Sequence, residues 1–363
     1  MVRRSALFLL LLLVPPTPAG AGEDVWTGVE RVVAVGDVHG DYDQLVAVLR
    51  SAGLIDEKGK WSGGKAHLVQ TGDVLDRGPD SRKAMDLLMK LEVEAKAAGG
   101  EVHALIGNHE AMILIGDYRY LSSEEIAAFR DQNSEKVREE AYKEHQKSAP
   151  AGTTFDDAYR KRWEAENPLG MTEFRRAFSA TGVYGKWIRG HNAIVQIDGS
   201  VFLHGGISPK LADWTVRRIN DQVRVELTDF AQLQGGIVMD DNGPLWYRGL
   251  ALRDDALRPH VETVLKNYKI ERIVIGHTYT EGAIVPRFGG RVVQIDVGLC
   301  RIYDANLRNA CLEIEKGKVR AIHRGKRLEL PGEDGLLRYL KEAAALDPSP
   351  SPLAPRIAEL ERK

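Results

Sequence analysis

The sequence is poor in cysteine, with only Cys300 and Cys311 among its 363 residues. Two cysteines are far too few for a scaffold built on disulfides, so the hydrophobic core must supply the stability of the fold. The two residues flank a turn between two expected strands, and in an oxidising compartment they would be able to form a disulfide. Two small buried thiols are an equally good interpretation.

The sequence also lacks a strong net charge and a long hydrophobic run. Its formal net charge is −2, which becomes −4 without residues 1–21, because Arg3 and Arg4 are the only charged residues there. Such a chain has no basic excess with which to attract nucleic acid. The apolar run at residues 6–14 is much shorter than the roughly 20 residues that a membrane-spanning helix needs. We therefore expect no nucleic-acid partner and no stable membrane anchor.

The first 21 residues are typical of a secretory signal peptide. Two arginines precede the apolar run, and a Pro-rich stretch then leads to a site of small residues that ends at Ala21. Cleavage is expected after Ala21. The protein is therefore predicted to be secreted or periplasmic.

The remaining sequence has a globular composition, since 43% of the whole chain is hydrophobic and 28% is charged. Short apolar runs rich in β-branched residues alternate with helical patterns in the first third, which predicts an α/β core. The later strands are more closely spaced, which favours a second, mixed sheet packed on the first. The expected strands are residues 32–35, 67–70, 102–106, 194–197, 201–203, 272–275 and 292–295, and the clearest helices are residues 42–52 and 80–98.

One catalytic domain is expected over residues 22–346, with a helical insertion at residues 111–181. Strand signals vanish in this insertion, and charged helical sequence replaces them. Ser122 and Glu125 have the spacing of a capping box, in which the glutamate reaches back to the serine amide. Because the insertion directly follows the segment around His109, we expect it to overhang that segment. Residues 347–363 form a Pro-rich C-terminal tail with a linker-like composition.

Five short segments place metal-capable or phosphate-capable side chains directly after an expected strand. Loops at the carboxyl edge of an α/β sheet gather ligands in this way, and the bordering glycines permit sharp turns. One segment alone would fit an ordinary turn or a buried histidine. Four of the ten histidines nevertheless lie within the five, so together they indicate a metal site. The segments are Gly36-Asp37-Val38-His39-Gly40, Gly72-Asp73-Val74-Leu75-Asp76-Arg77-Gly78, Gly107-Asn108-His109-Glu110, His204-Gly205-Gly206 and Gly276-His277-Thr278.

This ordered set of motifs resembles the phosphoprotein phosphatase branch of the calcineurin-like metallophosphoesterases. It is most similar to the Shewanella-like bacterial phosphatases, through Asp-Arg-Gly at 76–78, Gly-Asn-His-Glu at 107–110 and His-Gly-Gly-Ile-Ser-Pro at 204–209. The motifs extend from residue 36 to residue 278 and so cover most of the mature chain. The resemblance implies an α/β sandwich of two mixed β-sheets flanked by helices.

The resemblance also implies a centre with two metal ions. Asp37 and His39 would bind the first metal, and Asp73 would bridge both. The remaining ligands of the second metal would be Asn108, His204 and His277. Imidazole mixed with carboxylate suits transition metals, with Mn expected first and Fe or Zn as alternatives. Two cations roughly 3.5 to 4 Å apart can lower the pKa of a shared water, and the resulting hydroxide would attack phosphorus.

The same resemblance assigns catalytic roles to three further residues. His109 would be the general acid that protonates the leaving oxygen, and Asp76 would orient its imidazole and raise its pKa. Arg77 would clamp the phosphoryl oxygens, with Asn108 beside it.

A second phosphate-binding arginine is expected, and Arg248 is the candidate, with Arg189 as the alternative. The segment around Arg248 departs from the Leu-Trp-Ser-Asp pattern of the eukaryotic members. Its neighbours Trp246 and Tyr247 either line the pocket or belong to the core.

The predicted function is a phosphatase that hydrolyses phosphate monoesters. Its expected substrates are phosphorylated proteins, peptides or small phosphate esters, with tyrosine and serine or threonine both open. Hydrolysis of dinucleoside polyphosphates or other phosphoanhydrides is one alternative. A metal-stabilised binding module without catalysis is another, although none of the proposed ligands is missing.

Overall fold

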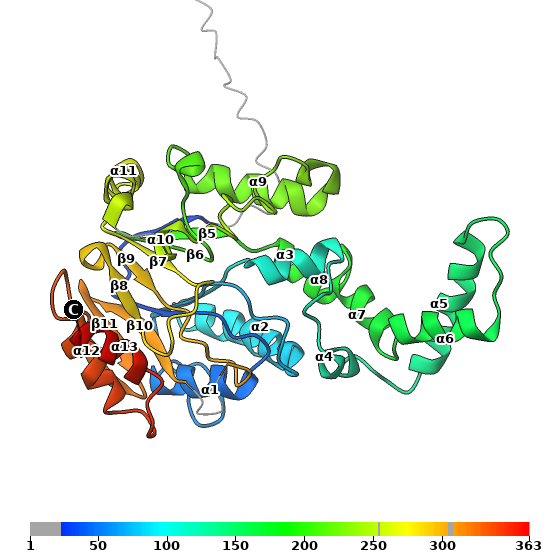
Figure 1. The fold of residues 1–363 in the computed structure, drawn as a ribbon, viewed down its shortest axis with the longest axis horizontal. Helices are drawn as coiled ribbons and strands as arrows, with labels where there is room; N and C mark the ends of the chain where they lie inside the picture. The colour runs from blue at the N-terminus through cyan, green and yellow to red at the C-terminus, as the bar shows by residue number, and fades with distance from the viewer. Residues whose placement is uncertain (1–22, 253–254, 304–307, 363) are drawn as a thin grey trace, which may run out of the picture.

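We describe the fold from a computed structural model, which covers residues 23–252, 255–303 and 308–362 (Figure 1). The expected signal peptide lies outside the described residues. Among the residues that are described, no helix is both long enough and apolar enough to cross a bilayer.

Two mixed β-sheets form the centre of the molecule, each with six strands in the described part of the chain. Helices cover the outer faces of both sheets (Figure 1). The predicted α/β sandwich of two mixed sheets is therefore confirmed. In order, the first sheet contains β12 (Lys326–Glu329), β11 (Lys318–His323), β10 (Ala310–Glu315), β2 (Arg31–Val35), β3 (His67–Gln70) and β4 (Glu101–Ala104), and the second contains β1 (Val25–Trp26), β5 (Ile194–Ile197), β6 (Ser200–Leu203), β7 (Arg272–Ile275), β9 (Val292–Gln294) and β8 (Val285–Arg287).

The parallel strands at the middle of each sheet position the functional site. β2, β3 and β4 run parallel in one sheet, and β6 and β7 run parallel in the other. Their residues are largely buried, as expected for strands covered on both faces, and β2 and β7 are rich in β-branched residues. Their carboxyl ends are followed by the five motif segments. The predicted strands at 67–70, 194–197 and 272–275 match to the residue, three others differ by one residue at one end, and 102–106 differs from β4 at both ends.

Helices α1 (Tyr42–Ser51) and α2 (Ser81–Ala97) cover the first sheet, where α2 buries Leu87, Leu88 and Leu91 at helical spacing. Helices α9 (Val216–Thr228), α10 (Gly249–Leu252) and α11 (Arg258–Tyr268) lie on the side of the second sheet (Figure 1). Short 3-10 turns occur at Pro209–Leu211, Phe230–Leu233, Asp255–Leu257 and Phe288–Gly290.

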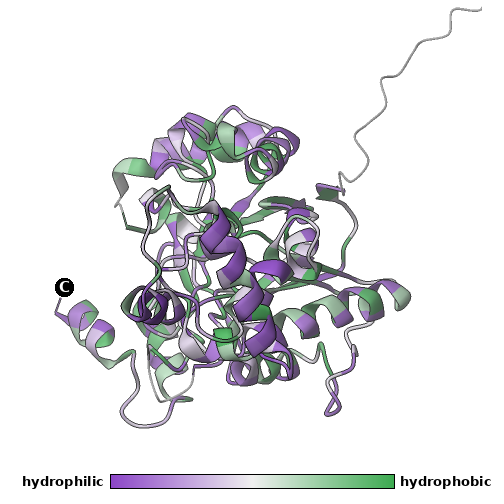
Figure 2. Ribbon diagram, turned by 90° about the vertical axis from the view of Figure 1, so that its right-hand side faces the viewer, coloured by the Kyte–Doolittle hydropathy of each residue, from purple (hydrophilic) through white to green (hydrophobic). Residues whose placement is uncertain are grey.

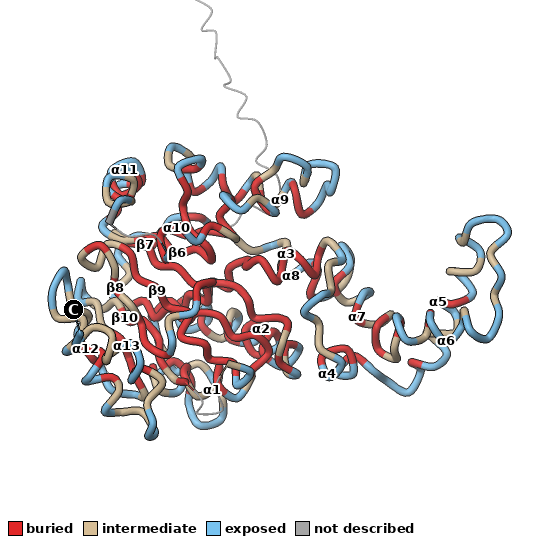
Figure 3. The backbone as a smooth tube through the Cα atoms, in the orientation of Figure 1, coloured by how far each residue is buried: buried red, intermediate tan, exposed pale blue. Residues whose placement is uncertain are grey.

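The segment between β4 and β5 is helical, as the sequence indicates. It comprises α3 (Asn108–Ile115), α4 (Ser123–Ala127), α5 (Ser134–Ser148), α6 (Asp157–Glu166), α7 (Met171–Phe178) and α8 (Val183–Arg189). Figure 1 shows that α5 and α6 project away from the two sheets as an arm, and their residues are mostly exposed or half-buried in Figure 3. Figure 2 faces the end of this arm, where hydrophilic residues predominate. The expectation that the insertion overhangs the site is therefore wrong for α5 and α6.

The expected capping box is only half formed. The Ser122 side chain accepts a hydrogen bond from the Glu125 amide at 3.1 Å, as an N-cap should. The Glu125 carboxylate, however, does not bond the serine amide. It accepts a hydrogen bond from the Asp76 amide instead.

The C-terminal segment is folded against the body rather than linker-like. It contains α12 (Leu336–Ala344) and α13 (Ala354–Glu361), with Leu353 buried between them. Asp347, at the start of the expected tail, is half-buried, and its side chain, which is 3% exposed, bonds His323 and Arg324. Cys300 and Cys311 are both free and buried, so the structure supports the interpretation as thiols.

Candidate active site

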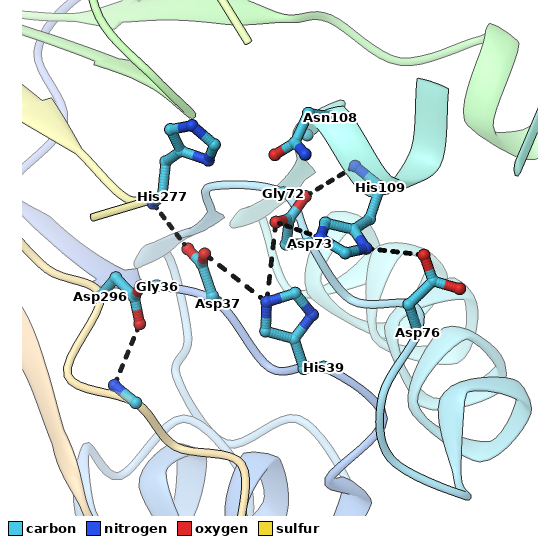
Figure 4. Close-up of polar contacts among 12 residues, drawn as sticks. Gly36, Asp37, His39, Gly72, Asp73, Asp76, Asn108, His109, His277 and Asp296 are labelled. Carbon is cyan, nitrogen blue, oxygen red and sulfur yellow. Dashed lines mark hydrogen bonds and ion pairs between the residues drawn. The ribbon is translucent and has the colours of Figure 1, made fainter. Parts of the chain in front are cut away.

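The five motif segments meet where the carboxyl ends of the two sheets come together, and Figure 4 labels residues of all of them except the His204 segment. Two overlapping groups of side chains have potential metal-binding atoms within 4.8 Å of one another. The first group is His39, Asp73 and His109, and the second is Asp73, His204 and His277. Asp73 belongs to both groups, which is the arrangement that a bridging carboxylate requires.

His39 directs its Nε2 toward two carboxylates. Its Nδ1 lies 3.0 Å from the Leu75 carbonyl, which leaves Nε2 at 3.9 Å from Asp37 Oδ2 and 3.7 Å from Asp73 Oδ2. In metal-binding histidines, a hydrogen bond from the ring nitrogen that does not bind the metal fixes the orientation of the ring, as the Leu75 carbonyl does here. Burial lowers the pKa of His39 to about 3, so the imidazole is neutral, as a metal ligand must be.

His204 is the centre of the second group. Its Nδ1 lies 2.9 Å from the Thr71 carbonyl, and its Nε2 lies 2.8 Å from Asn108 Oδ1, 3.0 Å from His277 Nδ1 and 3.2 Å from Asp73 Oδ2. Three further polar atoms thus converge on one imidazole nitrogen inside the protein.

These atoms fit two cations. The buried groups that face one another are imidazole nitrogens, carboxylate oxygens and an amide oxygen, and the donor set is the mixture that Mn, Fe or Zn accepts. Burying Asp37 and Asp73 together without a cation is costly, because neighbouring carboxylates repel each other and lose their hydration. The geometry therefore suits a metal on either side of Asp73.

The backbone holds these ligands in an unusual conformation. His39, Asp73 and His277 have φ angles of 46°, 57° and 63°, in the left-handed region that such residues seldom adopt. The loops are also very close together, since a Cβ on Gly72 would lie 2.5 Å from the Gly107 backbone. A strained, tightly packed backbone of this kind is common at functional sites.

Glu110 fixes the loop that carries Asp73. Its Oε2 accepts hydrogen bonds from the amides of Asp73 and Gly107, each at 2.8 Å, and its Oε1 accepts one from the Val74 amide at 2.8 Å. The sequence motif contains Glu110, but no role was expected for it. Its role depends on hydrogen bonds to a loop that is distant in sequence, which the motif alone does not reveal.

His109 and Asp76 form a buried pair beside the two metal-capable groups (Figure 4). His109 Nδ1 lies 2.6 Å from Asp76 Oδ2, and its Nε2 lies 3.7 Å from Asp73 Oδ2. Burial alone would lower the pKa of His109, but the charge of Asp73 and the hydrogen bond with Asp76 raise it above its ordinary value. The structure thus brings together the expected general acid, His109, and the carboxylate expected to orient its imidazole, Asp76.

Arg77 lies between two aromatic rings at the mouth of the site. The guanidinium carbon is 4.9 Å from the centre of the Tyr120 ring and 5.8 Å from that of Tyr303. Tyr279 stacks on Tyr303, with ring centres 5.3 Å apart. The sequence contains no periodic pattern that could have identified these three tyrosines.

Arg248, the expected second arginine, faces the same pocket. It donates to the His277 carbonyl at 2.6 Å and to Thr278 Oγ1 at 3.0 Å. Trp246 also lines the pocket, whereas Tyr247 is buried in the core. The alternative candidate, Arg189, does not line it and instead donates to the backbone carbonyls of residues 178, 185 and 227.

Asp296 is a site residue that the sequence analysis missed. It is buried, lines the same pocket and lies beside Asp37 (Figure 4). Burial and the charge of Asp296 raise the pKa of Asp37. Because Asp296 directly follows the expected strand 292–295, the rule that found the other motifs would have found it too.

The pocket that contains these groups has a volume of about 190 Å³. A larger, more open hollow of about 760 Å³ lies elsewhere, between Asp24, Trp214 and Tyr268. Cavity size alone therefore does not identify the site, and the set of converging ligands does. The smaller pocket is lined by Asp37, His39, Asp73, Arg77, Asn108, His109, Tyr120, Trp246, Arg248, His277, Tyr279, Asp296 and Tyr303.

Comparisons with known proteins agree with this geometry. The family model for calcineurin-like phosphoesterases matches residues 30–281. Shewanella-like protein phosphatase 2 of Arabidopsis thaliana is 30% identical over 315 residues, covering 80% of this chain and 77% of that protein. An uncharacterized protein of Schizosaccharomyces pombe is 31% identical over 316 residues, covering 82% of each. The crystal structure of a cold-active protein-tyrosine phosphatase from a psychrophilic Shewanella species is 27% identical, with a TM-score of 0.64 over 85% of this chain and 82% of that chain.

Proposed function

The chain belongs to the calcineurin-like phosphoesterase family and is a metal-dependent phosphatase, and we propose that it dephosphorylates proteins or peptides, with a preference for phosphotyrosine. The resemblance found in the motifs is thereby confirmed. The observation that carries the proposal is the position of Arg77, next to the candidate metal ligands and between Tyr120 and Tyr303. A phosphate bound there would hold its ester group among aromatic rings, which favours a phenyl group over a small alkyl group. The name of the Shewanella enzyme supports the same preference.

We propose that three residues bind the phosphate. Arg77 offers a planar fork of donors that matches phosphate oxygens, and Arg248 and Asn108 face the same pocket from other elements. When bound, two cations held by Asp37, His39, Asp73, Asn108, His204 and His277 would supply Lewis-acid activation of water and of the phosphoryl group.

The proton for the leaving group comes from His109 in this proposal. As the oxygen of a water molecule bonds to phosphorus, the bond between phosphorus and the ester oxygen breaks, and the ester oxygen takes the proton from His109 Nε2. Asp76 stays on Nδ1 and holds the ring in place. The uncharged alcohol or phenol then leaves, and phosphate remains with the arginines.

Two finer points of the proposal are the metal and the location. Mn is the proposed metal, with Fe or Zn as alternatives, and elemental analysis of the active protein would identify it. Export through the signal peptide at residues 1–21 is also proposed. Cell fractionation, combined with sequencing of the mature N-terminus, tests whether cleavage occurs after Ala21.

A substrate panel tests the function itself. The Mn-loaded protein should hydrolyse p-nitrophenyl phosphate, and it should hydrolyse a phosphotyrosine peptide faster than the matched phosphoserine peptide. The variant H109A should lose most of its activity on the phosphopeptides and less of its activity on p-nitrophenyl phosphate, whose leaving group needs no proton. Faster turnover of dinucleoside tetraphosphate than of any monoester would favour the phosphoanhydride alternative. No turnover of any substrate by a metal-loaded, folded protein would favour a binding module.

A further inference from the structure

Asp76 and Arg77 have a strained backbone. Their φ angles are 67° and 70°, so two consecutive residues other than glycine lie in the left-handed region. Such a backbone is unfavourable for residues with a side chain and persists only where the surrounding structure holds it in place. Asp76 contacts the proposed proton donor, and Arg77 is the proposed phosphate clamp. The contacts that hold these two residues therefore set the geometry of both the proton donor and the phosphate clamp.

Two hydrogen bonds from the segment after α3 hold this backbone. The Arg77 amide donates to the Tyr120 carbonyl at 3.1 Å, and the Asp76 amide donates to Glu125 Oε1 at 3.3 Å. Tyr120 precedes α4, and Glu125 lies within α4. The base of the helical insertion thus contacts the catalytic loop, although its arm projects away from it.

Glu125 is an unusual residue for this position. Its side chain is almost fully buried, with 1% of the residue exposed, and it lies beside the buried carboxylate of Asp76. The helix start at Ser122 fixes its backbone, and the Ser81 side chain lies near its carboxyl group. Burial, with the charge of Asp76 as the next cause, raises the pKa of Glu125 to about 8. A buried carboxyl group beside another one is expensive, so a merely structural position would favour an apolar residue.

We propose that Glu125 is a positioning residue, which holds the Asp76 amide and thereby fixes both the Asp76–His109 pair and the Arg77 guanidinium for catalysis. The proposal rests on the function proposed above. It also gives the base of the insertion a role: α4 supplies the support for the catalytic loop.

The hydrogen bond from the Asp76 amide needs an acceptor atom at the reach of a glutamate side chain. The variants therefore change either the acceptor or the length of the side chain. In E125Q the amide oxygen can still accept from Asp76, and the amide group can donate to Ser81. E125D is too short by one methylene, and E125A has no acceptor. The matched control is E124A, because Glu124 is on the same helix turn but exposed, and its side chain bonds only its neighbour Ser123.

The test compares two leaving groups with the Mn-loaded protein. A displaced Asp76–His109 pair slows phenyl phosphate, which needs protonation, more than p-nitrophenyl phosphate, which does not. We expect kcat for phenyl phosphate to fall at least tenfold in E125A and E125D, with a smaller loss on p-nitrophenyl phosphate. E125Q should stay within threefold of the wild type, E124A should be unchanged, and bound Mn should be equal in all variants.

Calorimetry with inorganic phosphate provides a second measurement that needs no turnover. Phosphate should bind at least fivefold more weakly to E125A and E125D than to E124A, because Arg77 is displaced.

If E125A does not fold, the comparison of E125D with E125Q decides alone. Equal kinetics and equal phosphate binding in E125D and E125Q would overturn the proposal. So would an equal loss on both leaving groups accompanied by loss of Mn. A wild type that binds phosphate without any turnover would refute the proposed function, while phosphate binding would still decide the role of Glu125.

Discussion

His109 Nδ1 and Asp76 Oδ2 lie 2.6 Å apart in a buried environment, and the other oxygen of Asp76 is buried without a hydrogen-bond partner. The carboxylate of Asp76 is therefore directed at the imidazole alone. Burial raises the pKa of Asp76, while its hydrogen bond with His109 opposes that rise. The proton between the pair stays with Nδ1 and orients the ring, so that Nε2 carries the proton that a leaving oxygen would take.

The first prediction concerns this pair. In D76N the side chain keeps its size but loses the charge that stabilises protonated His109. General acids typically contribute about 10²–10⁴ in rate, so kcat for phenyl phosphate should fall by about 10- to 100-fold. The loss on p-nitrophenyl phosphate should be smaller, and H109A should show the same pattern. A dependence on leaving-group pKa equal to that of the wild type would contradict the role of Asp76.

The second prediction concerns the clamp. R77K keeps the positive charge but loses the planar fork and much of the contact with Tyr120 and Tyr303. Inorganic phosphate should therefore inhibit R77K about tenfold more weakly, as expected for the loss of one charge-assisted hydrogen bond of about 1.5 kcal/mol.

The control for the clamp is R119K. Arg119 is exposed and pairs with Asp117 at 2.6 Å, so this change tests the same substitution on the surface. The inhibition constant of phosphate should not change in R119K. An equal effect in both variants would show that the arginine of the motif has no special role.

The third prediction concerns Asp296, whose carboxylate lies beside that of Asp37 among the candidate metal ligands (Figure 4). D296N removes a negative charge that a bound cation offsets. Mn affinity measured by calorimetry should fall about tenfold, while the metal-free protein should become more stable to heat because two buried carboxylates no longer repel each other.

E226Q is the control for this change. Glu226 is equally buried, but it bonds the amides of Ile237 and Val238 away from the pocket. Its replacement should lower the stability of the protein and leave Mn affinity unchanged. Unaltered Mn affinity in D296N would show that Asp296 does not contribute to the metal centre.

The sequence predicts the part of the fold that obeys a local rule. In buried strands such as β2 and β7 an apolar run follows a single arginine, so their extent is visible from composition. β10 was missed because its core position at Glu313 is charged, and Arg31 and Arg327 compensate that charge only in the folded protein. A pattern of hydrophobic residues cannot reveal a strand whose buried face includes an ion pair.

The residues of the site also fall into two groups, those that local motifs predict and those that only tertiary packing brings to the site. The six proposed ligands, Asp76, Arg77 and His109 follow strands and carry short motifs, and the structure brings them together. Tyr120 and Tyr303 come from segments without a pattern, so their contact with Arg77 depends on tertiary packing. Glu125 matched a local capping rule, but the Asp76 amide, distant in sequence, bonds its carboxylate instead. Local rules fail where a partner from another segment competes.

The last prediction concerns stability. The buried carboxylate of Asp347 bonds His323, Arg324 and Ser351, and these bonds outweigh the effect of burial and lower its pKa to about 2. A carboxyl group with a lowered folded pKa stabilises the fold above its unfolded pKa near 3.8, and this contribution is lost as the pH falls toward 2. D347N should therefore lower the free energy of unfolding at pH 7 by about 1–2 kcal/mol, less than the full pKa shift implies because solvent partly screens these interactions. In urea titrations this difference should shrink between pH 5 and pH 3, whereas D334N, a change at an exposed position, should have little effect at either pH. A difference that is independent of pH would mean that Asp347 stabilises the fold through packing rather than through its charge.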